Sequence, residues 1–350
     1  MTPALVLDAR VLVRREAPDA LGRVLAALQT EGVTAGDPST RRAAATMLST
    51  TATPSAAAEM LGAWFGLGFR GKTRVAAALR ERDAPATSVP AALELLDVAD
   101  ELEWRAIVAT DAPAWAPPLP SQLRRRVATV VSAATAGHPK EQPAFWSHLR
   151  ADASLDPALT IVVGESLDGD VRAPRSNGFA TARADRVEAL AELTEVLRAN
   201  GRSPAEAIAL VVGTPRPWGH RLVLEAPHLD ALVARVTRFR ARVHLGGDRP
   251  RAATVVRRAQ GVPVVALDGE LERRPLLVWI SARADPRSLR PPSDLARRLD
   301  DQGLSLDALP LHERRYLISL VREARDGATR SDRMKHVVEH VRTRSEGAAV

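Results

Sequence analysis

The chain has 350 residues, 45% of them hydrophobic and 26% charged, so it is longer than one hydrophobic core usually supports and should fold as two or more domains. It contains no cysteine, which excludes disulfides, thiolate metal sites and cysteine nucleophiles. The net charge of +7 would suit a polyanion, but nearly all the cations are arginines in an Ala- and Arg-rich composition and aromatics make up only 3%, so nucleic acid is not a favoured partner.

The first part of the chain predicts an α/β layer. Residues 4–13 form a short apolar run that predicts a buried strand, and residues 17–31 follow with helical periodicity. Two further strand candidates, 106–109 and 159–163, are separated by a predicted helix at 123–135. Because strands alternate with helices, we predict a Rossmann-like parallel sheet, in which functional side chains gather at the carboxyl ends of the strands.

The remaining elements divide the chain into three parts. The helical pattern of residues 40–103 predicts a helical cap on an α/β domain at residues 1–199. Residues 205–290 predict a small β-barrel or β-rich domain, and residues 291–350 a C-terminal helical hairpin. The β-rich segments are 207–212, 221–225, 241–244, 262–267 and 275–280, with turn residues at Gly246, Gly247, Asp268 and Gly269.

No apolar run approaches the roughly 18 to 20 residues that cross a bilayer. The N-terminus lacks the cationic start and small-residue cleavage site of a secretory signal. We therefore expect a cytoplasmic protein without a membrane partner, and the sequence predicts no particular oligomeric state.

Polar side chains follow each predicted strand of the first domain. Asp8 closes the first strand and Thr110 the second, Lys140 lies in a later loop, and Glu165 and Asp170 follow the third strand. Carboxylates on adjacent strand ends, together with a hydroxyl and a lysine, form the set that phosphoryl or similar transfer through an aspartyl intermediate requires.

These strand ends, with the segment TIVVGESLDGDVRAPRSNGFATA at residues 160–182, resemble the haloacid-dehalogenase (HAD) superfamily over roughly residues 1–190. The resemblance implies that Asp8 is a nucleophile, that Thr110 binds the oxygens of the substrate and that Lys140 steadies the charged intermediate. It also implies a magnesium ion, because Mg²⁺ takes oxygen ligands. The implied metal ligands are Asp8, Glu165 and Asp170.

The first motif departs from the family pattern. Phosphatases of the family carry Asp, any residue, Asp, Gly, Thr, whereas this chain has Asp8 followed by Ala9, Arg10, Val11 and Leu12. Arg10 cannot protonate a leaving group, because its guanidinium stays charged. We therefore predict that the domain binds a phosphorylated or other anionic small molecule, with weak or lost hydrolase activity.

Two alternatives stay open. One is an active Mg²⁺-dependent phosphatase or hydrolase in which Asp8 attacks the substrate. The other is a basic scaffold that binds nucleic acid or a protein partner, for which affinity would fall steeply with salt.

The C-terminal region, at residues 285–299 and 312–341, resembles the tail of the YdeI/OmpD-associated family. The residues that carry this resemblance are Arg314, Arg315, Tyr316, Glu323, Ala324, Arg325, Thr329, Arg330 and Arg333. In that family the tail follows a small β-barrel and has no established reaction, so the resemblance bears on fold more than on function.

Two short patterns match known motifs in unsuitable contexts. Residues 66–73 (GLGFRGKT) satisfy the phosphate-binding loop pattern, but the preceding residues read as a helix rather than the strand that such a loop follows. Residues 336–340 (HVVEH) match a zinc-binding pattern on a strongly charged helix. We favour an ordinary helix turn for the first and a solvated helix face for the second.

Overall fold

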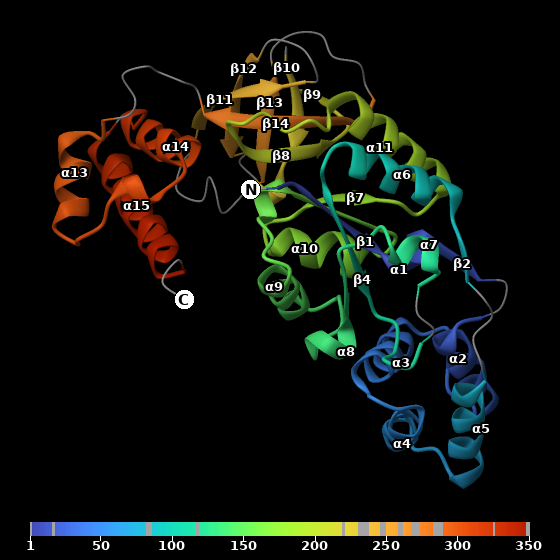
Figure 1. The fold of residues 1–350 in the computed structure, drawn as a ribbon. Coiled ribbons are helices and arrows are strands. Elements are labelled where there is room, and N and C mark those ends of the chain that lie inside the picture. The colour runs from blue at the N-terminus through green and yellow to red at the C-terminus, as the bar shows by residue number, and fades with distance from the viewer. Residues whose placement is uncertain are drawn as a thin grey trace. The chain divides into compact units, whose positions relative to one another are not determined.

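The computed structural model describes residues 2–15, 18–81, 86–116, 119–218, 221–229, 238–245, 250–257, 262–267, 274–282, 290–324 and 326–347. The chain divides into two compact units, Met1–Thr194 and Glu195–Val350 (Figure 1). Within the described residues, no helix combines the length and the apolar character needed to cross a membrane.

The first unit is built on a five-stranded parallel sheet in the order β5-β4-β1-β6-β7. The central strand β1 is buried along its whole length, as expected for a parallel sheet with both faces covered. This arrangement confirms the predicted Rossmann-like fold class. The strands are β1 (Ala4–Asp8), β4 (Arg105–Thr110), β5 (Thr129–Ser132), β6 (Thr160–Gly164) and β7 (Ala180–Arg183).

Helices connect the strands of this sheet, and one apolar core on it contains Phe145, Trp146 and Phe179. The ring of Trp146 meets those of Phe145 and Phe179 edge-on, with centroids 5.3 and 5.9 Å away. The helices are α6 (Pro90–Glu101), α7 (Ser121–Arg124), α8 (Ala133–Ala136), α9 (Pro143–Asp152), α10 (Ala173–Ser176) and α11 (Val187–Asn200).

One predicted helix of this unit is wrong. Residues 123–135 were expected to be helical, but Thr129–Ser132 forms the edge strand β5, between the short helices α7 and α8. The β-branched Thr129, Val130 and Val131 favour an extended backbone, which pairs with β4. The sheet therefore has a strand at this edge that periodicity did not indicate.

A separate helical cluster is inserted between the short strands β2 (Val13–Arg15) and β3 (Ala86–Ser88), which pair with each other. Asp19, Asp37 and Thr53 cap the first three of its helices, each accepting a hydrogen bond from a backbone N–H in the first turn. The helices are α2 (Ala20–Thr30), α3 (Pro38–Thr50), α4 (Pro54–Trp64) and α5 (Phe69–Arg80).

The predicted cap limits of 40–103 differ from the limits of this cluster. Its apolar core runs from Ala20 to Leu79, whereas α6 contacts β4 of the parallel sheet. The phosphate-loop pattern at residues 66–73 lies across the turn between α4 and α5, and the ammonium of Lys72 pairs with Glu59 at 3.2 Å. It thus follows a helix, as expected, and not a strand.

The second unit contains a curled antiparallel sheet of seven strands in the order β8-β14-β11-β12-β13-β10-β9. The strands are β8 (Ala207–Gly213), β9 (Arg216–Trp218), β10 (Arg221–Glu225), β11 (Arg238–His244), β12 (Arg251–Arg257), β13 (Pro263–Leu267) and β14 (Leu276–Ala282). The predicted β-rich segments all fall on strands, while β9 and β12 were not predicted. The predicted turn residues Gly246, Gly247, Asp268 and Gly269 lie outside the described residues.

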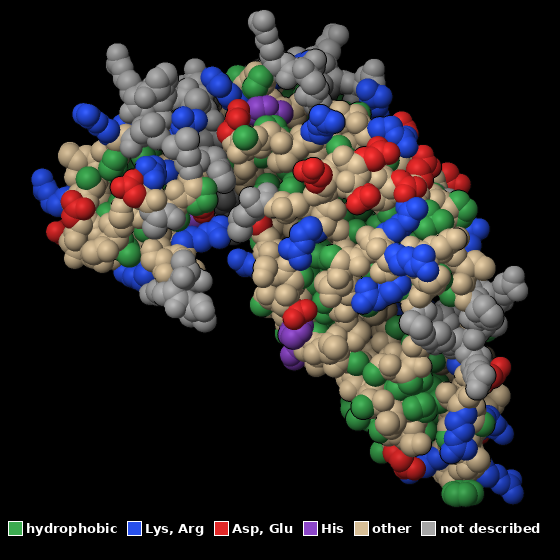
Figure 2. Space-filling model, viewed as in Figure 1, with side chains coloured by type: hydrophobic (Ala, Val, Ile, Leu, Met, Phe, Trp, Pro, Cys, Tyr) green, Lys and Arg blue, Asp and Glu red, His purple; other side chains and the backbone are tan. Residues whose placement is uncertain are grey.

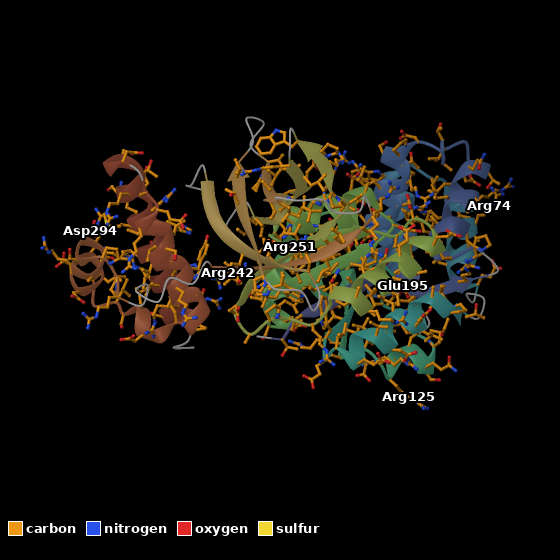
Figure 3. The ribbon with its side chains drawn as sticks, turned by 90° about the horizontal axis from the view of Figure 1, so that it is seen from above. Arg74, Arg125, Glu195, Arg242, Arg251 and Asp294 are labelled. Carbon is orange, nitrogen blue, oxygen red and sulfur yellow. The ribbon has the colours of Figure 1, made fainter. Side chains whose placement is uncertain are left out.

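The C-terminal residues form the helices α13 (Ser293–Asp300), α14 (Leu311–Arg322) and α15 (Gly327–Gly347). Asp294, labelled in Figure 3, accepts two hydrogen bonds from the guanidinium of Arg330, at 2.6 and 2.9 Å. This pair joins α13 to α15 and lowers the pKa of Asp294 to about 2. Arg325, named in the resemblance of this tail, lies outside the described residues.

Candidate functional site

The candidate site lies at the carboxyl ends of β1, β4 and β6, where the parallel register brings three chain segments together. Asp8 is the last residue of β1, and the one-turn helix α1 (Ala9–Leu12) begins directly after it. The carboxylate of Asp8 caps this turn, because Oδ1 accepts a hydrogen bond from the backbone N–H of Arg10 at 3.2 Å. The chain direction at the strand end therefore fixes the position of Asp8.

Lys140 bridges two buried carboxylates. Its Nζ lies 3.0 Å from Asp8 Oδ2 and 2.7 Å from Asp170 Oδ1, and the three side chains are 2%, 3% and 1% exposed in the order Lys140, Asp8, Asp170. An isolated charge at such depth would be costly, so the three groups must neutralise one another. The structure thus brings together three of the predicted site residues in one buried ionic cluster.

The backbone of Lys140 is held as firmly as its side chain. Its N–H donates to Asp111 Oδ1 at 2.9 Å, and its carbonyl accepts a hydrogen bond from the indole Nε1 of Trp146 at 2.7 Å. The second oxygen of Asp111 lies 3.9 Å from Lys140 Nζ. The sequence prediction missed Asp111, although its position directly after the predicted strand-end Thr110 could have indicated it.

Asp170 is positioned by the π-helical turn Leu167–Arg172 that follows β6. Its Oδ2 accepts a hydrogen bond from the backbone N–H of Ser166 at 2.9 Å. Gly164, the last residue of β6, makes room for this carboxylate: a Cβ on Gly164 would come within 2.3 Å of Asp170 Cγ. Only glycine at this strand end leaves Asp170 where it is.

The two buried carboxylates of the cluster have pKa values shifted in opposite directions. Burial would raise the pKa of Asp8, but the charges of Lys140 and Arg10 outweigh burial and lower that pKa below its ordinary value. Burial, together with the negative charge of Asp8, raises the pKa of Asp170 to about 7 although Lys140 opposes the rise. Burial opposes the charge of Lys140, yet its carboxylate neighbours raise its pKa above the usual value. At neutral pH, Asp8 is ionised and Lys140 is charged.

A cavity of about 340 Å³ opens beside this cluster, between the strand ends and the helical cluster. Thr110 and Glu165, predicted as site residues, line this cavity, whereas Asp8, Lys140 and Asp170 do not. Arg10 also lines it and lies 3.6 Å from Glu165. The hydroxyl of Thr110 accepts a hydrogen bond from the backbone N–H of Ala112 at 3.0 Å, which leaves its own proton free to be donated.

These residues do not fit a magnesium ion held by the three predicted ligands. The ammonium of Lys140 already lies between the carboxylates of Asp8 and Asp170, and Glu165 faces Arg10 instead. Each oxygen of Asp170 already has one partner, Lys140 Nζ for Oδ1 and the backbone N–H of Ser166 for Oδ2. Among the described residues, no group of three or more His, Asp or Glu side chains is arranged to hold a metal.

Figure 2 shows how the charged side chains of the described residues lie on one face. Lys and Arg side chains, in blue, are scattered there among acidic and apolar ones. The zinc-type pattern at the C-terminus is also occupied otherwise, since Nε2 of His340 pairs with Glu313. Neither feature adds a second site to the one at the strand ends.

No protein-family model matches this chain, and no curated protein matches it. The chain is similar to several solved structures. One is an L-2-haloacid dehalogenase from Xanthobacter autotrophicus with chloropropionic acid covalently bound (17% identity, 58% of this chain and 85% of that one, TM-score 0.33). Another is a HAD family enzyme from Bacteroides thetaiotaomicron in complex with magnesium and inorganic phosphate (14% identity, 52% and 93%, TM-score 0.36).

A third is a predicted phosphoglycolate phosphatase from Haemophilus somnus (15% identity, 51% of this chain and 84% of that one, TM-score 0.35). The likeness thus spans about half of this chain, and at such identities it assigns neither a reaction nor a ligand. The predicted resemblance of the C-terminal region to the YdeI/OmpD-associated family stays a prediction.

Proposed function

We propose that the cavity beside the buried cluster binds a small molecule with an anionic group, phosphate or carboxylate, and that hydrolysis there is slow or absent. The observation that carries the proposal is the position of Arg10, which lines the cavity just after β1 and whose guanidinium lies 3.6 Å from Glu165 on the same wall. The hydroxyl of Thr110 lines the same cavity and is free to donate to an anion. A guanidinium and a hydroxyl donor are the groups that recognise phosphate and carboxylate oxygens.

Slow or absent hydrolysis follows from the surroundings of Asp8. Its carboxylate is only 3% exposed, does not line the cavity and is held by Lys140 and by the backbone of Arg10. To attack a bound molecule, the carboxylate would have to break its contacts with Lys140 and with the backbone N–H of Arg10. Arg10 also cannot supply the proton that a leaving group needs, because the guanidinium stays charged.

The first experiment is calorimetric titration of the intact protein with four small acids. They are ethyl phosphate, 2-aminoethyl phosphate, propionate and 3-aminopropionate. We expect at least one to bind, and the substitution Arg10→Gln to weaken that binding by about tenfold or more, as loss of a charge-assisted contact would. Arg80→Gln, an exposed arginine at the end of α5, is the control and should bind as the wild type does. If none of the four acids binds, the proposed function is wrong.

A second candidate is hydrolysis in which Asp8 attacks the substrate. It is favoured by the lowered pKa of Asp8 and by its Oδ2, which is buried and has no hydrogen-bond partner besides the ion pair with Lys140. The test is turnover of p-nitrophenyl phosphate with and without Mg²⁺, comparing the wild type with Asp8→Asn. Turnover that the substitution abolishes in a folded variant would establish this candidate, and equal turnover in both proteins would reject it.

A further inference from the structure

We propose that the ligand of this cavity is a zwitterion, which carries an ammonium group as well as its acidic group. The inference rests on the proposed function and names the class of molecule that the site takes. It follows from the charges on the cavity wall and from what holds each of them.

The cavity wall carries more negative than positive charge. Of the charged side chains that line it, three are carboxylates, from Asp19, Asp111 and Glu165, and one is the guanidinium of Arg10. Arg10 is the single cation among the described lining residues. Counted by formal charge, the wall has an excess of two negative charges.

The partners of these carboxylates leave the excess uncompensated. Oδ1 of Asp19 accepts the backbone N–H of Gly22 at 2.8 Å as the cap of α2, which brings no opposite unit charge. Asp111 accepts the backbone N–H of Lys140, and its second oxygen is 3.9 Å from the ammonium that Asp8 and Asp170 hold more closely. Glu165 already faces Arg10 at 3.6 Å.

A ligand whose only charged group is anionic would be repelled by the net negative charge of the cavity wall. It would compete with Glu165 for Arg10 and would add negative charge to a wall that already has an excess. An ammonium on the same molecule removes this conflict, since Asp19 and Asp111 are acceptors for its protons. The cavity volume of about 340 Å³ lies at the small end of the range for ligand sites, about 300 to 1,000 Å³. The class is therefore a short amino acid or an aminated phosphate ester.

The test compares two matched pairs of acids by calorimetric titration of the intact protein. The pairs are 2-aminoethyl phosphate with ethyl phosphate, and 3-aminopropionate with propionate. Within a pair the acidic group is kept and only the ammonium differs. We expect the amino member of at least one pair to bind tenfold tighter or more than its partner.

Two isosteric variants locate the ammonium. Asp19→Asn and Asp111→Asn keep the hydrogen bonds to Gly22 and Lys140, because an amide oxygen still accepts. Combined, they should reduce the preference for the amino member to less than threefold. The matched control is Asp37→Asn, which changes the equivalent cap of α3 outside the cavity and should leave the preference intact.

The outcomes separate the two proposals. If an acid binds and loses affinity in Arg10→Gln, but its amino partner binds no tighter, the proposed function stands and the zwitterion is wrong. The zwitterion is also wrong if a preference exists and survives in the double variant while that variant remains folded by circular dichroism. If none of the four acids binds, both proposals fall together.

Discussion

Lys140 is the cation that pairs with both buried carboxylates of the site. Its ammonium lies within 3.0 Å of Asp8 and 2.7 Å of Asp170, and it is as buried as they are. Ion pairs at such depth contribute little net stability as pairs, but removing one member leaves an uncompensated charge. The neutrality of the site therefore depends on this one side chain.

Replacing Lys140 with methionine should lower the free energy of unfolding by about 3 to 5 kcal/mol, because two carboxylates then lose their cation in a buried setting. Urea denaturation followed by circular dichroism measures the change. Lys72→Met is the matched control, since Lys72 is only half-buried and its ammonium pairs with the exposed Glu59. It should change the same quantity by no more than about 1 kcal/mol. A similar loss in both variants would contradict the role given to Lys140.

Asp170 should make stability depend on pH in an unusual direction for a carboxylate. Its pKa is about 7 in the folded protein and about 3.9 in an unfolded chain. Between these values the folded state binds more protons, so the free energy of unfolding falls as pH rises from about 4 to 7. Asp170→Asn lacks this proton and should therefore gain stability relative to the wild type from pH 5 to pH 8.

The measurement is urea denaturation of wild type and Asp170→Asn at several pH values. Asp168→Asn is the control, because Asp168 is a more exposed carboxylate of the same turn and pairs with Arg172. Between pH 5 and pH 8, the stability difference from the wild type should change less for Asp168→Asn than for Asp170→Asn. A profile of Asp170→Asn parallel to that of the wild type would show that Asp170 does not titrate in this range.

At the scale of elements, the site depends on how two strands end. β1 ends in a one-turn helix capped by Asp8, and β6 ends in a glycine followed by a π-helical turn. Irregular π-helical turns are uncommon and occur often at functional sites. Here the turn directs Asp170 back toward the end of its own strand, where Gly164 leaves the space for it.

Gly164→Ala should therefore destabilise the protein by about 1 to 3 kcal/mol, as overpacking of a filled site does. The Cβ would lie 2.3 Å from Asp170 Cγ, so the carboxylate must move away from Lys140. Gly213→Ala offers a matched control at the end of β8, where a Cβ would meet only Leu224 Cδ2 at 3.9 Å. Thermal unfolding of the two variants should differ clearly, and an equal effect of both would contradict this packing argument.

At the scale of the whole molecule, the sequence predicted those features that follow from local pattern. Alternating apolar runs and helices indicated the parallel sheet. Polar residues after strand ends indicated Asp8 and Asp170, and the loop residue Lys140 came from the family resemblance; the structure brings the three together. Local pattern could not predict that Lys140 bridges Asp8 and Asp170, because that depends on which loop folds over the strand ends. It also could not predict that Glu165 turns to Arg10.

Local pattern also left two elements ambiguous. The strand β5 was not predicted because the residues on both sides of it form the short helices α7 and α8. The cap limits were misjudged because α6 has the same apolar periodicity as α2 to α5 but packs on the sheet. In both cases, tertiary packing decided what the local pattern left ambiguous.

Because the indole of Trp146 donates a hydrogen bond to the carbonyl of Lys140, Trp146 can serve as an NMR reporter of the buried cluster. A fluorine atom on that indole ring would sense shifts of the Lys140 backbone, and Trp146→Phe would identify its resonance among the six tryptophans. Ligand entry beside Arg10 and proton loss from Asp170 could then be followed in the native protein through separate changes in one spectral line.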